Sequence, residues 1–520
     1  MRSPDRRRAL LAGCMLLAGC NDTRDLAPAS PDTPWRIDVA TGTPSGDATT
    51  TTAAAPHFTV PRDPALPWPG EPADIDPNHS YSLAELIDIA ERRNKTTRIA
   101  WEQARQAAIG VGMAQAAYLP TLTASAIAGY QRIASPFPSN LVNRGYITAN
   151  AEEVFPELAI RYLLLDFGSR DAVVRGARQL SFASNVVFTA AHQSLILSVA
   201  QAYFTLDGVN ASLRAAKQTL GSAQLLQQSA EALDARGLGT VVATALARRG
   251  TAQARFDIAA ATSAQHNAMY ALLSAMDLPP NTVLRVEDSS GRPLVRQTGL
   301  DIDTMMHEAL SRRPDLLADL ARLRAAEAGV AEARAELYPK VSLSANIQGN
   351  IGRISVDGQR YQSVEQPQTG VFLHFDWPLY QGGLLQNRLR LAQSRQAEAE
   401  AALAEGSEQD MRQVALAYDQ VETGLSQYDA AVALQAASQQ AADSASQAYS
   451  NGVGTITDAI NALSTLAASR AAVAKAHAQS LVDAAALAFA TGALTSSMVP
   501  SLAPRSRVGA GRGSLSDAAE

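Results

Sequence analysis

The sequence predicts an internally duplicated α+β membrane protein, with four transmembrane β-strands and two long α-helical hairpins in each chain. Similar segments recur about 220 residues apart, which indicates a duplicated body. Four segments of about ten residues alternate apolar and polar side chains, which is the length and pattern of membrane barrel strands. Two Pro-free segments of about 65 residues each predict helices about 100 Å long.

The composition is that of a folded chain with an unusual source of apolar side chains. Of 520 residues 47% are hydrophobic but only 5% are aromatic, so Ala, Leu and Val supply most of the apolar content. Ala is the best helix former, and its small side chain lets helices approach closely. The formal net charge is −6, which argues against a nucleic-acid-binding protein because such proteins usually carry a basic face.

The first residues predict a lipoprotein signal peptide over 1–19. Arg2 and Arg6 begin a basic segment, an apolar run follows, and Leu17-Ala18-Gly19-Cys20 resembles the bacterial lipobox. The thiol of Cys20 would carry a covalent lipid, which adds membrane affinity. An earlier match ends at Cys14, but the apolar run before it is too short for a signal. The alternative is an ordinary secretory signal with incidental Cys residues.

Both Cys residues of the chain lie in this segment, so a mature chain would keep only Cys20. A disulfide framework and a Cys-ligated zinc site are therefore excluded. No other run of about 20 apolar residues occurs, so we expect no membrane-spanning helix. Residues 20–79 are rich in Pro, Thr, Ala and Asp and predict an extended tether, and residues 500–520 predict a disordered tail.

The duplication divides the body into a first repeat over 80–299 and a second over 300–499. Arg92 matches Arg312 and Tyr118 matches Tyr338, both at an offset of 220. The segment 237–240 matches 452–455 at an offset of 215. Each repeat has the same order of elements, namely helix, strand, strand, long helix, Gly turn and helix.

The predicted strands cover about 120–131 and 154–166 in the first repeat and about 340–351 and 369–380 in the second. Their apolar faces are listed here: Leu122, Ala124, Ala126, Ala128 and Tyr130; Leu158, Ile160, Tyr162 and Leu164; Val341, Leu343, Ala345 and Ile347; Val371, Leu373, Phe375, Trp377 and Leu379. A soluble half-buried sheet alternates in the same way, so this pattern alone leaves both environments open.

The predicted helical hairpins favour the membrane interpretation. They cover 168–276 and 383–492, and each consists of a long helix, a Gly motif and a second Pro-free helix. These lengths far exceed the average of about 11–12 residues and suit coiled-coil packing. A soluble helical bundle or a periplasmic adaptor could contain such hairpins, but neither has any need of the two strand pairs.

Four strands cannot close a membrane barrel, since such barrels begin at about eight strands. An open sheet edge is not tolerated in lipid. The chain must therefore share its barrel with copies of itself, and physics alone allows two copies or more.

Three motifs resemble those of TolC-like outer-membrane efflux proteins, and the lipobox suits the lipid-anchored branch of that family. They are Leu165-Asp166-Phe167-Gly168, Leu379-Tyr380-Gln381-Gly382-Gly383, and the segment from Ala448 to Asp458. The resemblance covers about residues 80–499. It implies a homotrimer with a 12-stranded β-barrel in the cell outer membrane, joined to an α-barrel that crosses the periplasm. It also implies a mixed belt, here the linker 279–297 and the chain ends.

The same resemblance implies the function. The trimer would be the passive exit duct of a tripartite efflux pump, conducting small molecules or drugs. It would dock on a periplasmic adaptor and an inner-membrane pump, of RND type or ABC type, which supplies the energy. A type I protein secretion system uses a duct of the same kind and remains an alternative. A periplasmic helical adaptor or scaffold and a lipid-anchored helical enzyme are further alternatives from other functional classes.

The resemblance also implies a periplasmic gate. Asp458 matches a family gate Asp, and three copies would form an acidic ring that favours cations. The family's second Asp is replaced here by Asn461 and a gate Arg by Gly454, while Ala243 occupies the position of Asp458 in the first repeat. Tyr449 matches a gate Tyr. The alternatives are a solvated Asp at a helix start and a packed aromatic at a helix end.

Glycines at the predicted hairpin turns have a backbone role, since such turns need a positive φ or a close approach. They are Gly237, Gly239, Gly452 and Gly454, and in the family these tips face the adaptor. The seven His residues show no metal-binding spacing, and no nucleotide-binding motif occurs. The sequence therefore predicts no catalytic site, no metal and no cofactor besides the lipid on Cys20.

Overall fold

The computed structural model describes residues 75–494, except residues 137, 139, 142–143, 290 and 295–300. Before residue 75 it describes only residues 31, 37–38 and 43–44. The chain divides into two units, 1–71 and 72–520. In the first unit, β1 (Ile37–Asp38) pairs antiparallel with β2 (Thr43–Pro44). The predicted signal peptide, Cys20, most of the tether and the tail at 500–520 lie outside the described residues.

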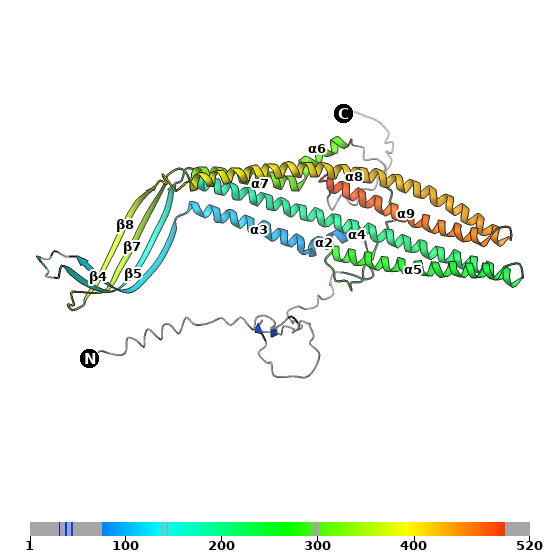
Figure 1. Cartoon of the computed structure of the whole chain (residues 1–520), viewed down its shortest axis with the longest axis horizontal. Helices are drawn as coiled ribbons and strands as arrows, with labels where there is room; N and C mark the ends of the chain where they lie inside the picture. The colour runs from blue at the N-terminus through cyan, green and yellow to red at the C-terminus, as the bar shows by residue number, and fades with distance from the viewer. Residues whose placement is uncertain are drawn as a thin grey trace, which may run out of the picture. The chain divides into compact units, whose positions relative to one another are not determined.

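The second unit contains the two repeats in the predicted order, with the initial helix of each repeat split in two (Figure 1). The first repeat consists of β3 (Ser80–Tyr81), α2 (Leu83–Arg93), α3 (Lys95–Gln115), the 3-10 turn Ala116–Tyr118, β4 (Thr121–Pro136), β5 (Tyr146–Leu165), α4 (Ser169–Ala235) and α5 (Val241–Ala275). After the linker strand β6 (Arg285–Val286), the second repeat consists of α6 (Ile302–Arg312), α7 (Pro314–Ala335), β7 (Lys340–Val356), β8 (Gln362–Asp376), α8 (Leu384–Ser450) and α9 (Ile456–Ala490).

The two helical hairpins have the same dimensions. Helices α4 and α8 each have 67 residues, and α5 and α9 each have 35. Every hairpin position of the first repeat therefore matches the position 215 residues later without a gap. At 1.5 Å per residue the longer helices are about 100 Å long, as the sequence predicted.

At the elbow between the two initial helices, the backbone aligns the two repeats one residue differently from the sequence match. Asn94 ends α2 and begins α3, and Arg313 ends α6 and begins α7, in nearly the same backbone conformation. The structural offset at the elbow is therefore 219, one less than the 220 at which Arg92 and Arg312 match. Helix α7 is one residue longer than α3, 22 against 21, and restores the offset of 220.

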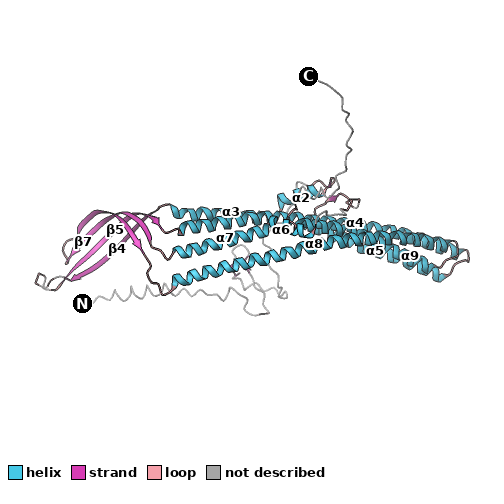
Figure 2. Cartoon of the chain, turned by 90° about the horizontal axis from the view of Figure 1, so that it is seen from above, coloured by secondary structure: helices cyan, strands magenta, loops and turns pink. Residues whose placement is uncertain are grey.

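The four long strands form one antiparallel sheet in the order β4-β5-β7-β8. Figure 2 shows this sheet in magenta at one end of the helices. The β5–β7 pair joins the two repeats, and β4 and β8 form the two edges. The register places the predicted apolar side chains opposite one another: Leu122 faces Ile160, Leu158 faces Ile347 and Leu343 faces Leu373.

Three details of the predicted strands are wrong. Strand β4 continues to Pro136 and β5 begins at Tyr146, because the ladder of backbone hydrogen bonds continues where the side-chain alternation fades. For the same reason β7 continues to Val356 and β8 begins at Gln362, beyond the predicted bounds of 351 and 369. A register shift between Leu163 and Leu165 leaves Leu164 unpaired, as in a β-bulge. Strand β8 ends at Asp376, so Trp377 and Leu379 lie beyond it rather than on its apolar face.

Helix α4 is the centre of the helical region, since it contacts α3, α5, α7 and α9. Its buried Phe204 lies in the main apolar core, with side chains of α2, α5 and α9. Among the described helices, α4 is the one with an 18-residue window apolar enough for a membrane span by length and composition. In the single chain only 22% of that window is buried, so packing within the chain covers part of its apolar surface.

The linker between the repeats is bound to the helical region by strand pairing and by hydrogen bonds. Strand β6 pairs in parallel with β3, which brings the linker beside the start of the described body. The Tyr203 hydroxyl donates to the Glu287 carbonyl oxygen at 2.9 Å, and the Ser289 hydroxyl donates to Asp207 Oδ2 at 2.7 Å. Burial raises the pKa of Tyr203 to about 12. This segment lies within the predicted belt at 279–297, of which residues 290 and 295–297 are outside the described residues.

Candidate functional site: the sheet surface and the hairpin tips

One face of the sheet carries a continuous apolar band. Residues two apart on a strand share a face, and paired residues on neighbouring strands lie on the same face. The band begins with Val341 opposite Phe375 and ends with Val154 opposite Ile351. Its large side chains are exposed to solvent in the single chain, including Leu122, Val371, Leu373 and Phe375. An apolar surface of this extent needs a partner that shields it from water.

The height of this band matches a membrane. From Val341 to Ile351 there are ten residue steps, or about 34 Å along the strand. With the tilt of about 40° that is usual for barrel strands, the band is about 26 Å high. The apolar band of outer-membrane barrels is about 25 Å high. The aromatic side chains Trp377 and Tyr380 lie beyond the end of β8 and are also exposed.

The opposite face of the sheet is mostly polar, although Ile127 and Phe372 also lie on it. Asn346 Nδ2 donates to Glu157 Oε1 at 3.4 Å, and Asn350 Nδ2 donates to Glu153 Oε1 at 3.0 Å. The Ser344 hydroxyl lies 2.7 Å from Nε2 of His374. An apolar face and a polar face on the same strands are what a barrel with a water-filled interior requires.

Both edges of this sheet are open in the single chain. Among the strands that the structure describes, none pairs with the outer edge of β4 or of β8. Each edge strand therefore presents a row of unsatisfied N–H and C=O groups, which lipid does not tolerate.

The far ends of the hairpins carry the predicted turn glycines. Gly237 and Gly452 adopt positive φ values of 73° and 75°. Gly239 and Gly454 satisfy a different requirement, since a Cβ on Gly239 would lie 2.6 Å from the amide nitrogen of Asp234 and one on Gly454 would lie 2.9 Å from Cβ of Ala448. The glycine pairs thus form two turns of the same design.

Asp458 lies in the first turn of α9 and is exposed. The Asp458 amide donates to the Thr455 hydroxyl oxygen at 3.1 Å, and that hydroxyl donates to Asp458 Oδ2 at 2.7 Å. Asp458 is thus part of the N-terminal cap of α9. In the first repeat Ala243 occupies the same place, and Thr240 caps α5 without a carboxylate partner.

The other two predicted gate residues lie in different surroundings. Asn461 is exposed one helical turn beyond Asp458. Tyr449 is buried in an apolar cluster with Leu226 and Ala230 of α4 and with Ile456 of α9. The Tyr449 hydroxyl is buried without a hydrogen-bond partner, and burial raises its pKa. The structure therefore brings Asp458 and Asn461 to one exposed helix start, while Tyr449 joins the two hairpins.

Two buried ionic contacts were not recognised in the sequence as sites. Arg170 binds Asp166 at the junction of β5 and α4, with a nitrogen–oxygen distance of 3.0 Å. Arg313 binds Asp410 at the elbow of the second repeat, at 2.8 Å. Asp166 belongs to a quoted motif and Arg313 directly follows the matched Arg312, but nothing in the sequence reveals that Asp410 faces inward from an alanine-rich helix. Within the described residues, no group of three or more His, Cys, Asp or Glu side chains is placed to hold a metal ion.

Comparisons with known proteins agree with this geometry. The family model described as outer membrane efflux protein matches residues 86–277 and 305–493. Outer membrane protein OprJ of Pseudomonas aeruginosa is 28% identical over 71% of this chain and 75% of that protein. The toluene efflux pump outer membrane protein TtgF of Pseudomonas putida is 29% identical over 64% of this chain and 66% of that protein.

The fold has solved counterparts as well. The structure of the outer-membrane channel OprN superposes with a TM-score of 0.68 at 21% identity, covering 79% of this chain and 90% of that chain. The family match covers both repeats, including both strand pairs and both hairpins. The chain therefore belongs to the outer membrane efflux protein family.

Proposed function

We propose that this chain is the subunit of the outer-membrane exit duct of a tripartite efflux pump, and that the duct conducts small molecules passively. One observation carries the proposal: a four-stranded sheet with an apolar face about 26 Å high and two open edges continues into two helical hairpins of equal length. The sheet supplies the membrane segment, and the hairpins supply a helical wall about 100 Å long.

Three copies would close the sheet. Edge strand β4 of one protomer would pair with edge strand β8 of the next, and three protomers of four strands give a barrel of 12 strands. The polar face with Glu153, Glu157 and His374 would then line the interior, and the apolar band would face lipid. Closure would satisfy the edge groups that lipid leaves unpaired.

The partners follow from the passive character of such a duct. The hairpin tips, with exposed Leu238 and Val453, would contact a periplasmic adaptor, and an inner-membrane pump would supply the energy. The relative TtgF is a toluene efflux pump component by name, which supports a small-molecule cargo. We propose the same class of cargo for this chain.

The assembly is tested with the mature protein extracted in detergent. We expect a trimer by native mass spectrometry, and discrete cation-conducting channels when it is added to planar lipid bilayers. A monomeric protein that stays in solution without detergent would contradict the proposal, because its apolar band would then need no lipid.

We further propose that Asp458 narrows the periplasmic end as a ring of three carboxylates. It is exposed at the start of α9, next to Asn461, and its negative charge would favour cations. The change Asp458→Ala should raise single-channel conductance or lower the preference for cations in bilayers. Asp419→Ala, at an exposed carboxylate far from the tip, is the control. If both variants conduct like the wild type, Asp458 is only a helix cap.

The lipid anchor on Cys20 is also a proposal. Cells fed labelled palmitate should incorporate label into the wild-type chain and not into Cys20→Ser. The barrel should still bring the unlabelled variant to the outer membrane, so the two anchoring modes can be separated by fractionation. Equal labelling of both chains would contradict lipidation at Cys20.

A further inference from the structure

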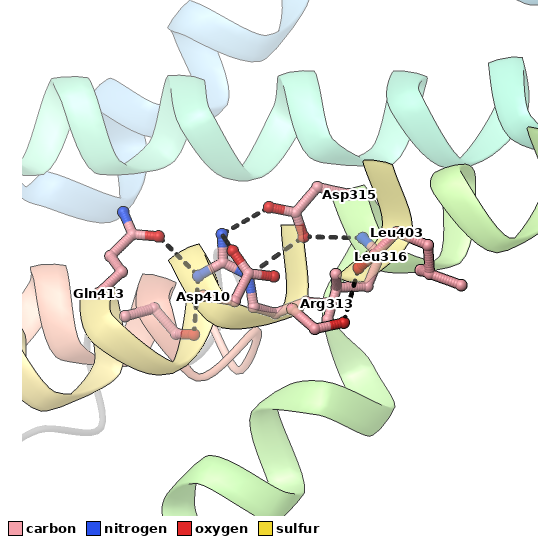
Figure 3. A network of polar contacts seen from close by, with 8 residues as sticks. Arg313, Asp315, Leu316, Leu403, Asp410 and Gln413 are labelled. Atoms are coloured by element: carbon pink, nitrogen blue, oxygen red, sulfur yellow. Dashed lines mark hydrogen bonds and ion pairs between the residues drawn. The ribbon is translucent and has the colours of Figure 1, made fainter. Parts of the chain in front are cut away.

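The elbow of the second repeat contains a buried ionic network that the channel function does not by itself explain (Figure 3). The Arg313 side chain is 7% exposed, and its guanidinium binds Asp410 at 2.8 Å and Asp315 at 2.5 Å. It also donates to Gln413 Oε1 at 2.6 Å and to the Ala490 carbonyl oxygen at 3.2 Å. One guanidinium thus joins the start of α7, the middle of α8 and the end of α9.

Two carboxylates, those of Asp315 and Asp410, bind the single guanidinium of Arg313, although one would balance its charge. Asp315 is half-exposed and binds Arg313 with both oxygens, whereas the Asp410 side chain is 8% exposed. Asp410 Oδ2 is buried and has no hydrogen-bond partner. A buried charged oxygen without a partner is unfavourable, while the neutral acid tolerates burial better.

The pKa values follow this asymmetry. Burial raises the pKa of Asp410 to about 6, against the opposing charge of Arg313 and with the added repulsion of Asp315 and Asp319 from α7. Burial also acts to raise the pKa of Asp315, but the hydrogen bonds and charge of Arg313 outweigh it, and that pKa is below its ordinary value. Helices α6 and α9 contribute apolar side chains to this region, among them Met305 and Leu487.

The first repeat provides an internal reference, because it has the same backbone without these charges. Its elbow residue is Asn94, whose side chain accepts from the Thr97 amide and caps α3. The position that matches Asp410 is Leu195, which is buried in the main apolar core. A hairpin of this length therefore folds without an ionic elbow, and the charges of the second repeat need a separate explanation.

The network lies where a small movement has a large consequence. Asp410 is 26 residues from the start of α8 and 40 residues from its end at Ser450. The tip is therefore about 60 Å from the network. A rotation of about 5° at the elbow would displace the tip by about 5 Å over this length.

We propose that Arg313 and Asp410 form a proton-responsive anchor that positions the α8–α9 hairpin, and hence the periplasmic end of the channel. A neutral Asp410 holds the hairpin in the position seen here. An ionised Asp410 favours positions in which its carboxyl group reaches water, which lets the tip move. This inference rests on the proposed channel function for its consequence, but the movement itself can be measured without a channel.

The direction of the pH effect follows from the linkage between proton binding and conformation. The conformation that buries Asp410 has the higher pKa, about 6 against an ordinary value of 3.8, so proton uptake favours it. Between the acid and the alkaline limits the balance between buried and hydrated positions should change by up to about 100-fold, since one pKa unit corresponds to a factor of ten. Acidification through about pH 6 therefore restricts the α8–α9 hairpin to the position in which Asp410 is buried.

The test measures the distance between the two hairpin tips of one protomer. Spin labels are placed at Leu238→Cys and Val453→Cys, both exposed turn positions, in detergent-solubilised protein diluted with unlabelled chains. Pulsed electron resonance should give a broad distance distribution at pH 7.5 and a narrow one at pH 5. Asp410→Asn, which is always neutral, should give a narrow distribution at both pH values.

Companion variants keep the result interpretable. Arg313→Met removes the charge that opposes protonation and should move the midpoint of narrowing to higher pH. The double change Arg313→Asn with Asp410→Leu copies the residues of the first repeat. This variant should give a narrow distance distribution at every pH. Asp419→Asn, at an exposed carboxylate of α8, should behave like the wild type.

The inference is overturned if the wild-type distribution does not change between pH 7.5 and pH 5, or if Asp410→Asn retains the wild-type change. A second measurement separates this failure from failure of the channel proposal. Wild-type trimers that conduct in bilayers but show no tip movement would refute the anchor alone. If Asp410→Asn does not fold, Asp410→Glu keeps the charge and should keep the pH response.

Discussion

The two repeats share one backbone plan but have different interiors. Their hairpins agree in helix length, in turn glycines and in the N-terminal Thr of the second helix. The matched interior positions differ: buried Phe204 of α4 corresponds to exposed Asp419 of α8, and buried Leu195 corresponds to buried Asp410. Turns and caps constrain the backbone at a few positions, whereas the packing side chains depend on neighbours that the repeats do not share.

The neighbours explain this divergence. The linker between the repeats contacts α4 through Tyr203 and Asp207, and the apolar core of the first repeat continues beneath it to Leu284. Helix α8 is instead covered at this level by α6, with Met305 and Ala309 packed against Val414 and Ala417. Equivalent positions thus face a large core in one repeat and a small one in the other.

The largest difference between matched positions should be at Phe204 and Asp419. Phe204→Ala removes a fully buried ring and should lower the free energy of unfolding by about 4 kcal/mol. Asp419→Ala changes an exposed side chain and should have an effect within about 0.5 kcal/mol. Denaturant unfolding of the detergent-solubilised protein, followed by helix content, measures both. Equal effects would mean that the repeats share a common core after all.

A smaller difference is expected at the junction of sheet and helix. Arg170 binds Asp166 and donates to the carbonyl oxygens of Leu163 and Leu164, while the matched Leu385 is a buried apolar residue. Arg170→Met removes the charged partner of Asp166, which keeps only the bond from the backbone amide of residue 170, and should destabilise by about 3 kcal/mol. Leu385→Met preserves volume and should cost under about 1.5 kcal/mol. If Arg170→Met is as mild as Leu385→Met in the same unfolding assay, the ionic junction is dispensable.

The smallest effects should be at the caps of the second helices. Thr240→Ala and Thr455→Ala each remove an N-cap and should destabilise by about 1 kcal/mol. Only Thr455→Ala also frees Asp458 from its hydrogen bond, so only this variant should alter channel conductance. A conductance change in Thr240→Ala as well would show that general loosening of the tips, and not Asp458, is measured.

Much of the plan was predictable from the chain because it depends on local signals. Helix and turn positions follow from Pro-free stretches and from glycine pairs such as Gly237 and Gly239. Strand faces follow from alternation, and the register confirms that Leu158 and Leu343 lie on the apolar face. The prediction failed at Leu164, Trp377 and the 220-residue offset at the elbow, because bulges, strand ends and helix register are decided by pairing with other segments.

The sequence by itself determined the duplication, the lengths of the hairpins and the need for partner chains, since each follows from periodicity and from the unsatisfied edges of a short sheet. Only the tertiary structure decided that Tyr449 is buried between the hairpins and that Asp410 faces Arg313. The reason is physical: which side of a long alanine-rich helix is buried depends on the helices beside it, and small side chains leave little record of that choice in the sequence.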